Sequence, residues 1–271
     1  MGLALFDRTW VPLQVICPLS LNSRSRMIVN YQPVIELASG KVAKVEVLGR
    51  PKAPGKRISD VIRSAEQSGD IKRMTDQILD LALAEWHKVA RSDIELSINL
   101  SLRNLDEKDL PKRVVKALKR HHLDPNSLWL EIDEKAQQLT NGQWLDRMRE
   151  LQSVGVRFSV DSFGAEITQA TAYDLARLPI AELKIDGPVV SDSDSNMDHR
   201  GHITAAVQIA RQLKLATSAK GIERAEIAGL CTRLGCTYGQ GYFYARPMPV
   251  AELVSIIDSF KAPLTSAPTN P

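Results

Sequence analysis

Three short stretches decide the fold that this sequence predicts: IELSINL at residues 94–100, LWLEI at 128–132 and VRFSVD at 156–161. Each is a β-type run of apolar residues that carries a polar residue at or near its end, and each is followed by a helix-like stretch. Strands that alternate with helices predict parallel βαβ units, and eight such units close into a barrel whose active face lies at the carboxyl ends of the strands.

The same pattern recurs along most of the chain, so we expect an α/β fold of the (β/α)8 TIM-like barrel type. The clearest helix is Ile203–Leu213, which has one apolar face. The predicted strands are Ile28–Ile35, Ala43–Leu48, Ile94–Leu100, Leu128–Ile132, Val156–Asp161, Glu182–Asp186, Leu215–Lys220 and a short one at Thr237–Tyr238.

Polar residues that follow or end these runs should converge at one end of the barrel: Glu46, Asn99, Glu131, Asp161, Lys184, Glu223 and Gln240. Three carboxylates and one amide, from Glu46, Asn99, Glu131 and Asp161, form an all-oxygen set that suits Mg²⁺ or Mn²⁺. Two such ions can activate a water for an in-line phosphodiester displacement. Lys184 and Asp186 could orient that water. Taken singly, each acid could equally be a helix cap or a surface charge.

Composition is compatible with one such domain, because 271 residues with 44% hydrophobic content exceed the roughly 250 that an α/β barrel needs. A net charge of +3 does not by itself favour a nucleic-acid partner. Three cysteines, Cys17, Cys231 and Cys236, form no paired framework, so we expect a reducing cytoplasm and no zinc site.

Three segments divide the chain. Residues 1–26 are expected to be an N-terminal appendage or linker, residues 27–261 the barrel, and residues 262–271 a disordered proline-rich tail. The apolar run Trp10–Cys17 is too short to span a bilayer, so we expect no membrane association.

Nine motifs, in order, resemble those of EAL domains, the family of cyclic di-GMP phosphodiesterases and their non-hydrolysing relatives. About 220 residues fall under this resemblance, which implies an EAL-type barrel. The motifs are YQPV at 31–34, EVLGR at 46–50, AE at 65–66 with Gly69 and Ile71, NLS at 99–101, EIDE at 131–134, DSFG at 161–164, LKID at 183–186, GIE at 221–223, and QGY at 240–242 with RP at 246–247.

The resemblance also implies roles for individual residues. Metal ligands would be Glu46, Asn99, Glu131 and Asp161, holding Mg²⁺ or Mn²⁺. The catalytic surround would be Lys184, Asp186, Glu223 and Glu134. Contacts to the dinucleotide would come from Gln32, Arg50 and Gln240, and an Arg50 guanidinium can bind a phosphate through two oxygens.

Two positions depart from the family pattern. Ser162 stands where the family has a second aspartate, and Lys220 stands where it has a glutamate. Losing two carboxylates and gaining an ammonium changes the local formal charge by about three units, which disfavours a second cation. Lys220 could pair instead with Asp161, with Asp186 or with a ligand phosphate. We therefore expect hydrolysis to be weak or absent.

Two other segments could be read as functional sites. Lys112–His122 is basic, but its apolar residues predict an amphipathic barrel helix, so a nucleic-acid partner is not expected. Ser191–His202 contains Asp and His, yet its polarity indicates a flexible connector before the Ile203 helix.

Three functions remain open. The favoured one is a degenerate EAL domain in bacterial cyclic di-GMP signalling, which binds cyclic di-GMP or a protein partner with little or no hydrolysis. The others are an active metal-dependent phosphodiesterase that gives linear pGpG, and a nucleotide-independent protein-interaction module. A protein partner or a homodimer would carry the output.

Overall fold

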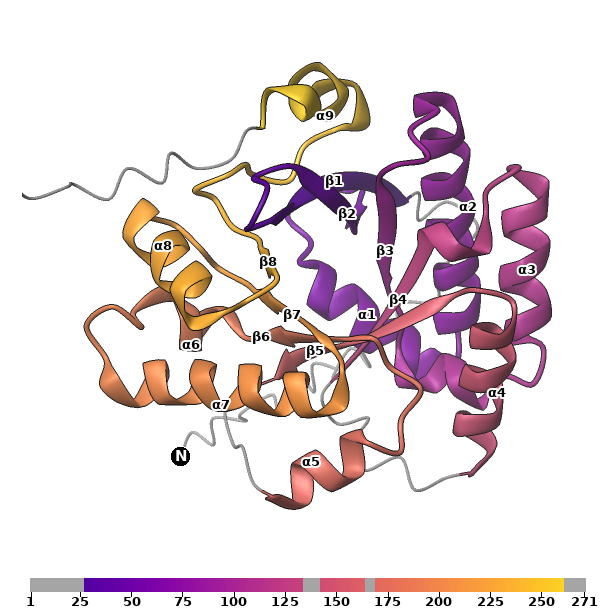
Figure 1. Ribbon diagram of the computed structural model, residues 1–271. Helices are drawn as coiled ribbons and strands as arrows, with labels where there is room; N and C mark the ends of the chain where they lie inside the picture. Colours follow the sequence, from indigo (N-terminus) through magenta and orange to yellow (C-terminus); the bar gives the residue numbers. More distant parts are fainter. Residues whose placement is uncertain (1–26, 134–141, 164–168, 261–271) are drawn as a thin grey trace, which may run out of the picture.

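A computed structural model describes residues 27–133, 142–163 and 169–260. Its eight strands close into one barrel in sequence order, surrounded by helices (Figure 1). The strands are β1 (Met27–Glu36), β2 (Val42–Pro51), β3 (Glu95–Asn99), β4 (Leu128–Asp133), β5 (Arg157–Phe163), β6 (Glu182–Ile185), β7 (Ala216–Ala219) and β8 (Tyr238–Gly239). All eight predicted strands are present, with ends within three residues of those expected.

Helices follow most of the strands and cover the outside of the barrel. They are α1 (Ile58–Ser68), α2 (Ile71–Val89), α3 (Leu110–Arg120), α4 (Gly142–Ser153), α5 (Gln169–Leu175), α6 (Gly187–Ser191), α7 (Met197–Leu213), α8 (Ala225–Leu234) and α9 (Val250–Ile256). Short 3₁₀ helices are η1 (Leu102–Asp106), η2 (Pro125–Ser127) and η4 (Ile257–Ser259).

The prediction that all strands run parallel is wrong for β1. This strand is antiparallel to both of its neighbours, β2 and β8, and joins β2 through a tight turn without a helix. Gly40 in that turn has a φ of 68°, which a glycine adopts without strain. The remaining neighbours, from β2 round to β8, are parallel as expected.

The prediction of a connector over Ser191–His202 is wrong at both ends, because only residues 192–196 lie between α6 and α7. The α6 helix ends at Ser191, and α7 begins at Met197, six residues before the expected Ile203. The side chain of Asn196 accepts hydrogen bonds from the backbone N–H groups of Asp198 and His199, which fixes the start of α7. The basic stretch forms α3 as predicted, with Val114 and Leu118 buried.

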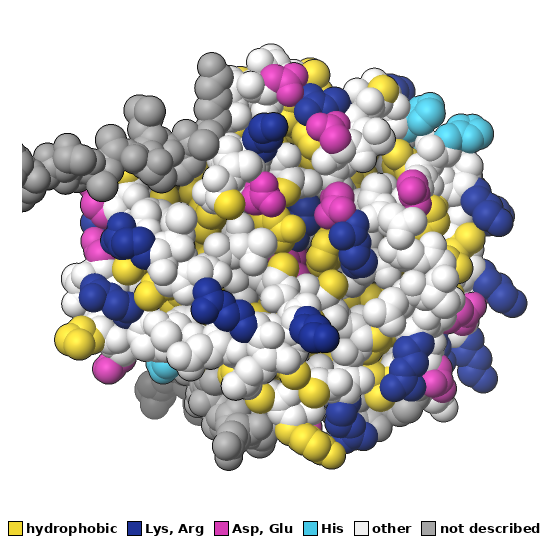
Figure 2. Space-filling view, in the orientation of Figure 1, with side chains coloured by type: hydrophobic (Ala, Val, Ile, Leu, Met, Phe, Trp, Pro, Cys, Tyr) yellow, Lys and Arg dark blue, Asp and Glu magenta, His cyan; other side chains and the backbone are white. Residues whose placement is uncertain are grey.

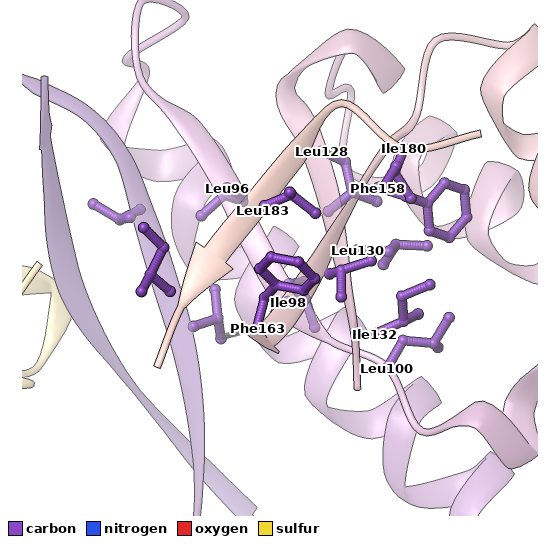
Figure 3. Close-up of a cluster of buried hydrophobic side chains, with 14 of the residues drawn as sticks. Leu96, Ile98, Leu100, Leu128, Leu130, Ile132, Phe158, Phe163, Ile180 and Leu183 are labelled. Carbon is purple, nitrogen blue, oxygen red and sulfur yellow. The ribbon is translucent and has the colours of Figure 1, made fainter. Parts of the chain in front are cut away.

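The core lies between the barrel and its helices. Leu96 and Ile98 of β3 and Leu128, Leu130 and Ile132 of β4 belong to this buried cluster (Figure 3). Because side chains alternate across a strand, the residues between them face the barrel interior. On the surface, basic and acidic side chains are interspersed on the face drawn in Figure 2. Among the described residues, no helix has both the length and the apolar character needed to cross a bilayer.

Candidate functional site

The barrel interior carries two layers, each with one acidic and one basic side chain, contributed by β2 and β6, which lie four strands apart in the closed barrel. In the lower layer, Lys44 of β2 donates to both carboxylate oxygens of Glu182 of β6, each at 2.6 Å. Two residues further along each strand the charges are exchanged, with Glu46 on β2 and Lys184 on β6. The upper layer forms the floor of the site.

Lys184 is the centre of that floor. Its Nζ lies 2.6 Å from both carboxylate oxygens of Glu131 and 3.2 Å from Oε2 of Glu46. Ser97 donates a further hydrogen bond to Glu131. The Lys184, Glu46 and Glu131 side chains are all less than a tenth exposed, so their charges compensate one another in a largely desolvated environment.

Glu46 is held from two further sides by amides. Asn99 donates to its Oε1 at 2.9 Å and Gln240 to its Oε2 at 2.8 Å. The Gln240 amide also lies 3.3 Å from Oε1 of Gln32, whose own amide donates to the carbonyl of Ala245 at 3.0 Å. The buried glutamines therefore orient Glu46.

Burial and charge shift the pKa values of this group in different directions. Burial raises the pKa of Glu46, but the Lys184 and Lys220 charges and the amide hydrogen bonds outweigh it and lower the pKa to about 2. For Glu131, burial and the nearby Glu46 charge outweigh Lys184 and raise the pKa to about 7. Burial lowers the pKa of Lys184, yet Glu131 and Glu46 more than reverse this and raise it. Glu46 and Lys184 are thus charged at neutral pH.

Asp161 lies at an irregularity of β5. The register with β6 shifts between Val160 and Phe163, and Ser162 adopts a φ of 58°, as expected for a β-bulge that redirects a side chain. At the end of β7, Lys220 lies with its Nζ 2.6 Å from Oδ1 of Asp161. Of the three partners that the sequence allowed for Lys220, the structure places Asp161 in contact.

Two cavities flank Glu46, and Glu46 and Leu48 line both. The larger, about 570 Å³, extends toward α1, α2 and η1 and is lined by Arg50, Asn99, Glu131 and Asp161 among others. The smaller, about 380 Å³, is lined by Gln32, Asp186, Lys220, Glu223 and Gln240 among others. The Lys220–Asp161 pair thus has one member in each cavity.

The site therefore brings together ten of the eleven residues predicted for it. Arg50 is half-buried, and its Nη1 donates to the carbonyl of Gly49 at 2.9 Å. Asp186 accepts from the N–H of Gly187 at 3.0 Å, capping α6. Glu223 is exposed at the rim of the smaller cavity. Glu134 lies outside the described residues.

The predicted metal ligands have the right oxygen donors for a hard cation, but their arrangement does not fit one as it stands. Lys184 forms ion pairs with Glu46 and Glu131, and Lys220 forms one with Asp161. Within residues 27–133, 142–163 and 169–260, no group of three or more His, Cys, Asp or Glu side chains is placed to hold a metal ion. Two ammonium groups, those of Lys184 and Lys220, instead contact the three carboxylates.

Sequence analysis assigned no role to several residues that support the site. Ser97 lies two residues before Asn99 on β3, so strand alternation alone places it on the same side. Glu66 accepts a hydrogen bond from Ser101 at 2.6 Å, and both line the larger cavity. The Lys44–Glu182 pair gave no signal, because the partners are 138 residues apart in the chain.

Comparison with known proteins gives consistent results. The family model described as the EAL domain matches residues 19–247. The bifunctional diguanylate cyclase/cyclic di-GMP phosphodiesterase MucR of Pseudomonas aeruginosa is 30% identical over 240 residues, which is 86% of this chain and 35% of that protein. The cyclic di-GMP phosphodiesterase NbdA of the same species is 29% identical over 238 residues, 86% of this chain and 30% of NbdA.

This chain therefore spans about a third of the length of the curated relatives it matches. Among solved structures, the PaMucR phosphodiesterase in complex with c-di-GMP is similar with a TM-score of 0.78 and 30% identity. That match covers 85% of this chain and 95% of the solved one.

Proposed function

The chain belongs to the EAL domain family, and from that premise we propose that it binds cyclic di-GMP across the two cavities and hydrolyses it little or not at all. The family places it in cyclic di-GMP signalling. The finer assignment depends on the side chains of the site.

Binding is supported by the shape and chemistry of the two cavities. A cyclic dinucleotide has two nucleoside halves joined by two phosphates, and two cavities that share Glu46 and Leu48 suit a ligand with two halves. Apolar side chains such as Ile62 and Met74 in the larger cavity suit a base, and the Arg50 guanidinium there suits a phosphate. The solved relative at 30% identity binds c-di-GMP.

The observation that carries the second half of the proposal is the ion pair between Lys220 and Asp161. Phosphodiesterases of this family generally depend on a divalent cation. Here three carboxylates, from Glu46, Glu131 and Asp161, already face two ammonium groups, which leaves at most a single net negative charge to attract cations. A site with so little excess charge is poorly suited to two divalent ions.

In this account each residue binds or positions the ligand and none moves a proton. Lys184 holds Glu46 and Glu131 in the floor of the site, and Gln240 orients Glu46. Arg50 binds a phosphate from the larger cavity. Gln32 and Gln240, which are buried, shape the boundary of the smaller one.

An active phosphodiesterase is the second candidate, because one observation favours it. The complete set of Glu46, Asn99, Glu131, Asp161 and Lys184 is present, and its members lie together. Displacement of the two lysines by cations would recover this activity.

Calorimetric titration with cyclic di-GMP in the presence of Mn²⁺, followed by chromatography of the cell contents, distinguishes these candidates. The expected result is saturable heat of binding with unchanged ligand. Linear product that forms at a rate proportional to protein concentration would instead establish the phosphodiesterase. If neither heat nor product is detected, both candidates are excluded.

A further inference from the structure

Lys220 is placed and charged so that it can do more than neutralise Asp161. It lies at the carboxyl end of β7, where the active face of the barrel is, and its backbone N–H donates to the carbonyl of Ile185 at 3.1 Å. Its side chain is 23% exposed and lines the smaller cavity. The ammonium group is therefore fixed at its base but open to a ligand.

An ammonium group has three N–H donors. Within the part of the chain that the structure describes, Lys220 uses one of them, for Asp161 at 2.6 Å. Lys184 differs, because its Nζ contacts three oxygens of two glutamates and is 2% exposed. Of these two ammonium groups, Lys220 retains donors for an anionic ligand.

We propose that the Lys220 ammonium binds a phosphate of the cyclic dinucleotide in place of a metal ion, so that this chain holds its ligand without any divalent cation. The inference rests on the proposed function, since it names how that site meets the charge of its ligand. It follows from the misfit between the carboxylate set and a metal: the positive charge facing Asp161 is part of the polypeptide.

The geometry suits this role. Asp161 lines the larger cavity and Lys220 the smaller, so the ammonium lies at the boundary between the two halves of the ligand site. A phosphate that joins the two halves would meet it there. Lysine provides a compact point charge, and the ion pair with Asp161 orders the side chain before the ligand arrives, which reduces the entropy lost on binding.

A simpler role would be structural: Lys220 could serve only to neutralise Asp161. The two roles predict different effects of removing Asp161 as well. If Lys220 only neutralises Asp161, its removal weakens binding in EDTA through the unpaired carboxylate, and the double variant Lys220→Met/Asp161→Asn, which has no such charge, regains the native affinity. If Lys220 binds phosphate, the double variant binds as weakly in EDTA as Lys220→Met alone.

The test is calorimetric titration with cyclic di-GMP, in EDTA and separately in excess Mg²⁺, for the native chain and for Lys220→Met, Lys220→Arg and Lys220→Met/Asp161→Asn. Lys119→Met, an exposed lysine of α3, is the matched control. We expect the native chain and the control to bind equally well in both buffers. In EDTA, Lys220→Met should bind about ten- to hundredfold more weakly, the usual effect of losing a charged hydrogen bond. Lys220→Arg should retain most of the affinity.

Three results would overturn the inference while leaving the proposed function intact: native binding that requires Mg²⁺, Lys220→Met binding as tightly as the native chain in EDTA, or Lys220→Met/Asp161→Asn regaining the native affinity in EDTA. Absence of native binding in both buffers would overturn the proposed function itself. If circular dichroism shows that Lys220→Met does not fold, the binding of Lys220→Arg in EDTA decides. A folded Lys220→Arg that does not bind the dinucleotide would contradict the inference, because a guanidinium also supplies a positive charge to the phosphate.

Discussion

Replacing Glu182 with leucine tests the charge layer beneath the site. Glu182 is 1% exposed and Lys44 2%, and the Nζ of Lys44 lies 2.6 Å from the carboxylate. Glu182→Leu keeps the approximate volume but leaves the Lys44 ammonium buried without a counter-charge. Removing one partner of a buried pair generally costs about 3–5 kcal/mol.

Two aromatic rings reduce that cost. The Nζ of Lys44 lies 4.1 Å from the ring centre of Trp129 and 4.4 Å from that of Tyr238. Both contacts survive the substitution and continue to stabilise the cation. We therefore expect a loss near the lower limit, about 3 kcal/mol, and a fall in Tm of about 6–12 °C for a domain of this size.

The assay is urea unfolding followed by circular dichroism, with Glu150→Leu, an exposed glutamate of α4, as the control for the change in composition. The double variant Lys44→Met/Glu182→Leu should recover most of the lost stability, because an apolar pair of similar volume needs no charge compensation. The reasoning is refuted if Glu182→Leu costs less than about 1 kcal/mol, or if the double variant is as unstable as the single one.

Three other outcomes are expected. Ser162→Asp combined with Lys220→Glu should create cyclic di-GMP hydrolysis detectable in Mn²⁺, and aspartate tolerates the φ of 58° at position 162; a double variant that folds and binds but never forms product would contradict this. Gly241→Ala should cost about 3 kcal/mol or more in urea unfolding, because its Cβ would lie 2.0 Å from a backbone oxygen. The hydrogen bond from His121 is the main cause that lowers the pKa of Asp80 from 3.8, so this carboxyl stabilises the fold above about pH 4 and the gain is lost as pH falls. Between about pH 6 and pH 3, the free energy of unfolding of Asp80→Asn should consequently fall less than that of the native chain in urea unfolding. The difference should be under about 1 kcal/mol, because Asp80 is half exposed.

Short apolar β-type runs, each with a polar residue at or near its end, were sufficient to predict every strand, because the apolar residues of each run lie in the core. Such a run could not give the direction of β1 relative to its neighbours, since an apolar stretch has the same composition whichever way the strand runs in the sheet. The early start of α7 was missed for a related reason. Residues 197–202 have no apolar period, and the helix begins there because Asn196 caps it.

The candidate site was predictable as a set of residues but not as a set of contacts. Strand ends indicated that Glu46, Glu131 and Lys184 would meet. Two contacts depend on distances across the closed barrel: Lys184 bridges both glutamates, and Lys220 pairs with Asp161 and not with Asp186. Sequence spacing carries no such information for residues that lie on different strands.

The central claim is that the chain binds cyclic di-GMP without cleaving it, and phosphorus NMR of the mixture in Mg²⁺, a diamagnetic cation that leaves the phosphorus signals sharp, tests it most directly. The account predicts that the phosphodiester resonance shifts or broadens as protein is added and that no other phosphorus signal develops with time. A phosphate monoester resonance that grows in proportion to protein concentration, and does not form in a matched sample of Glu46→Gln, would contradict the account and establish a phosphodiesterase.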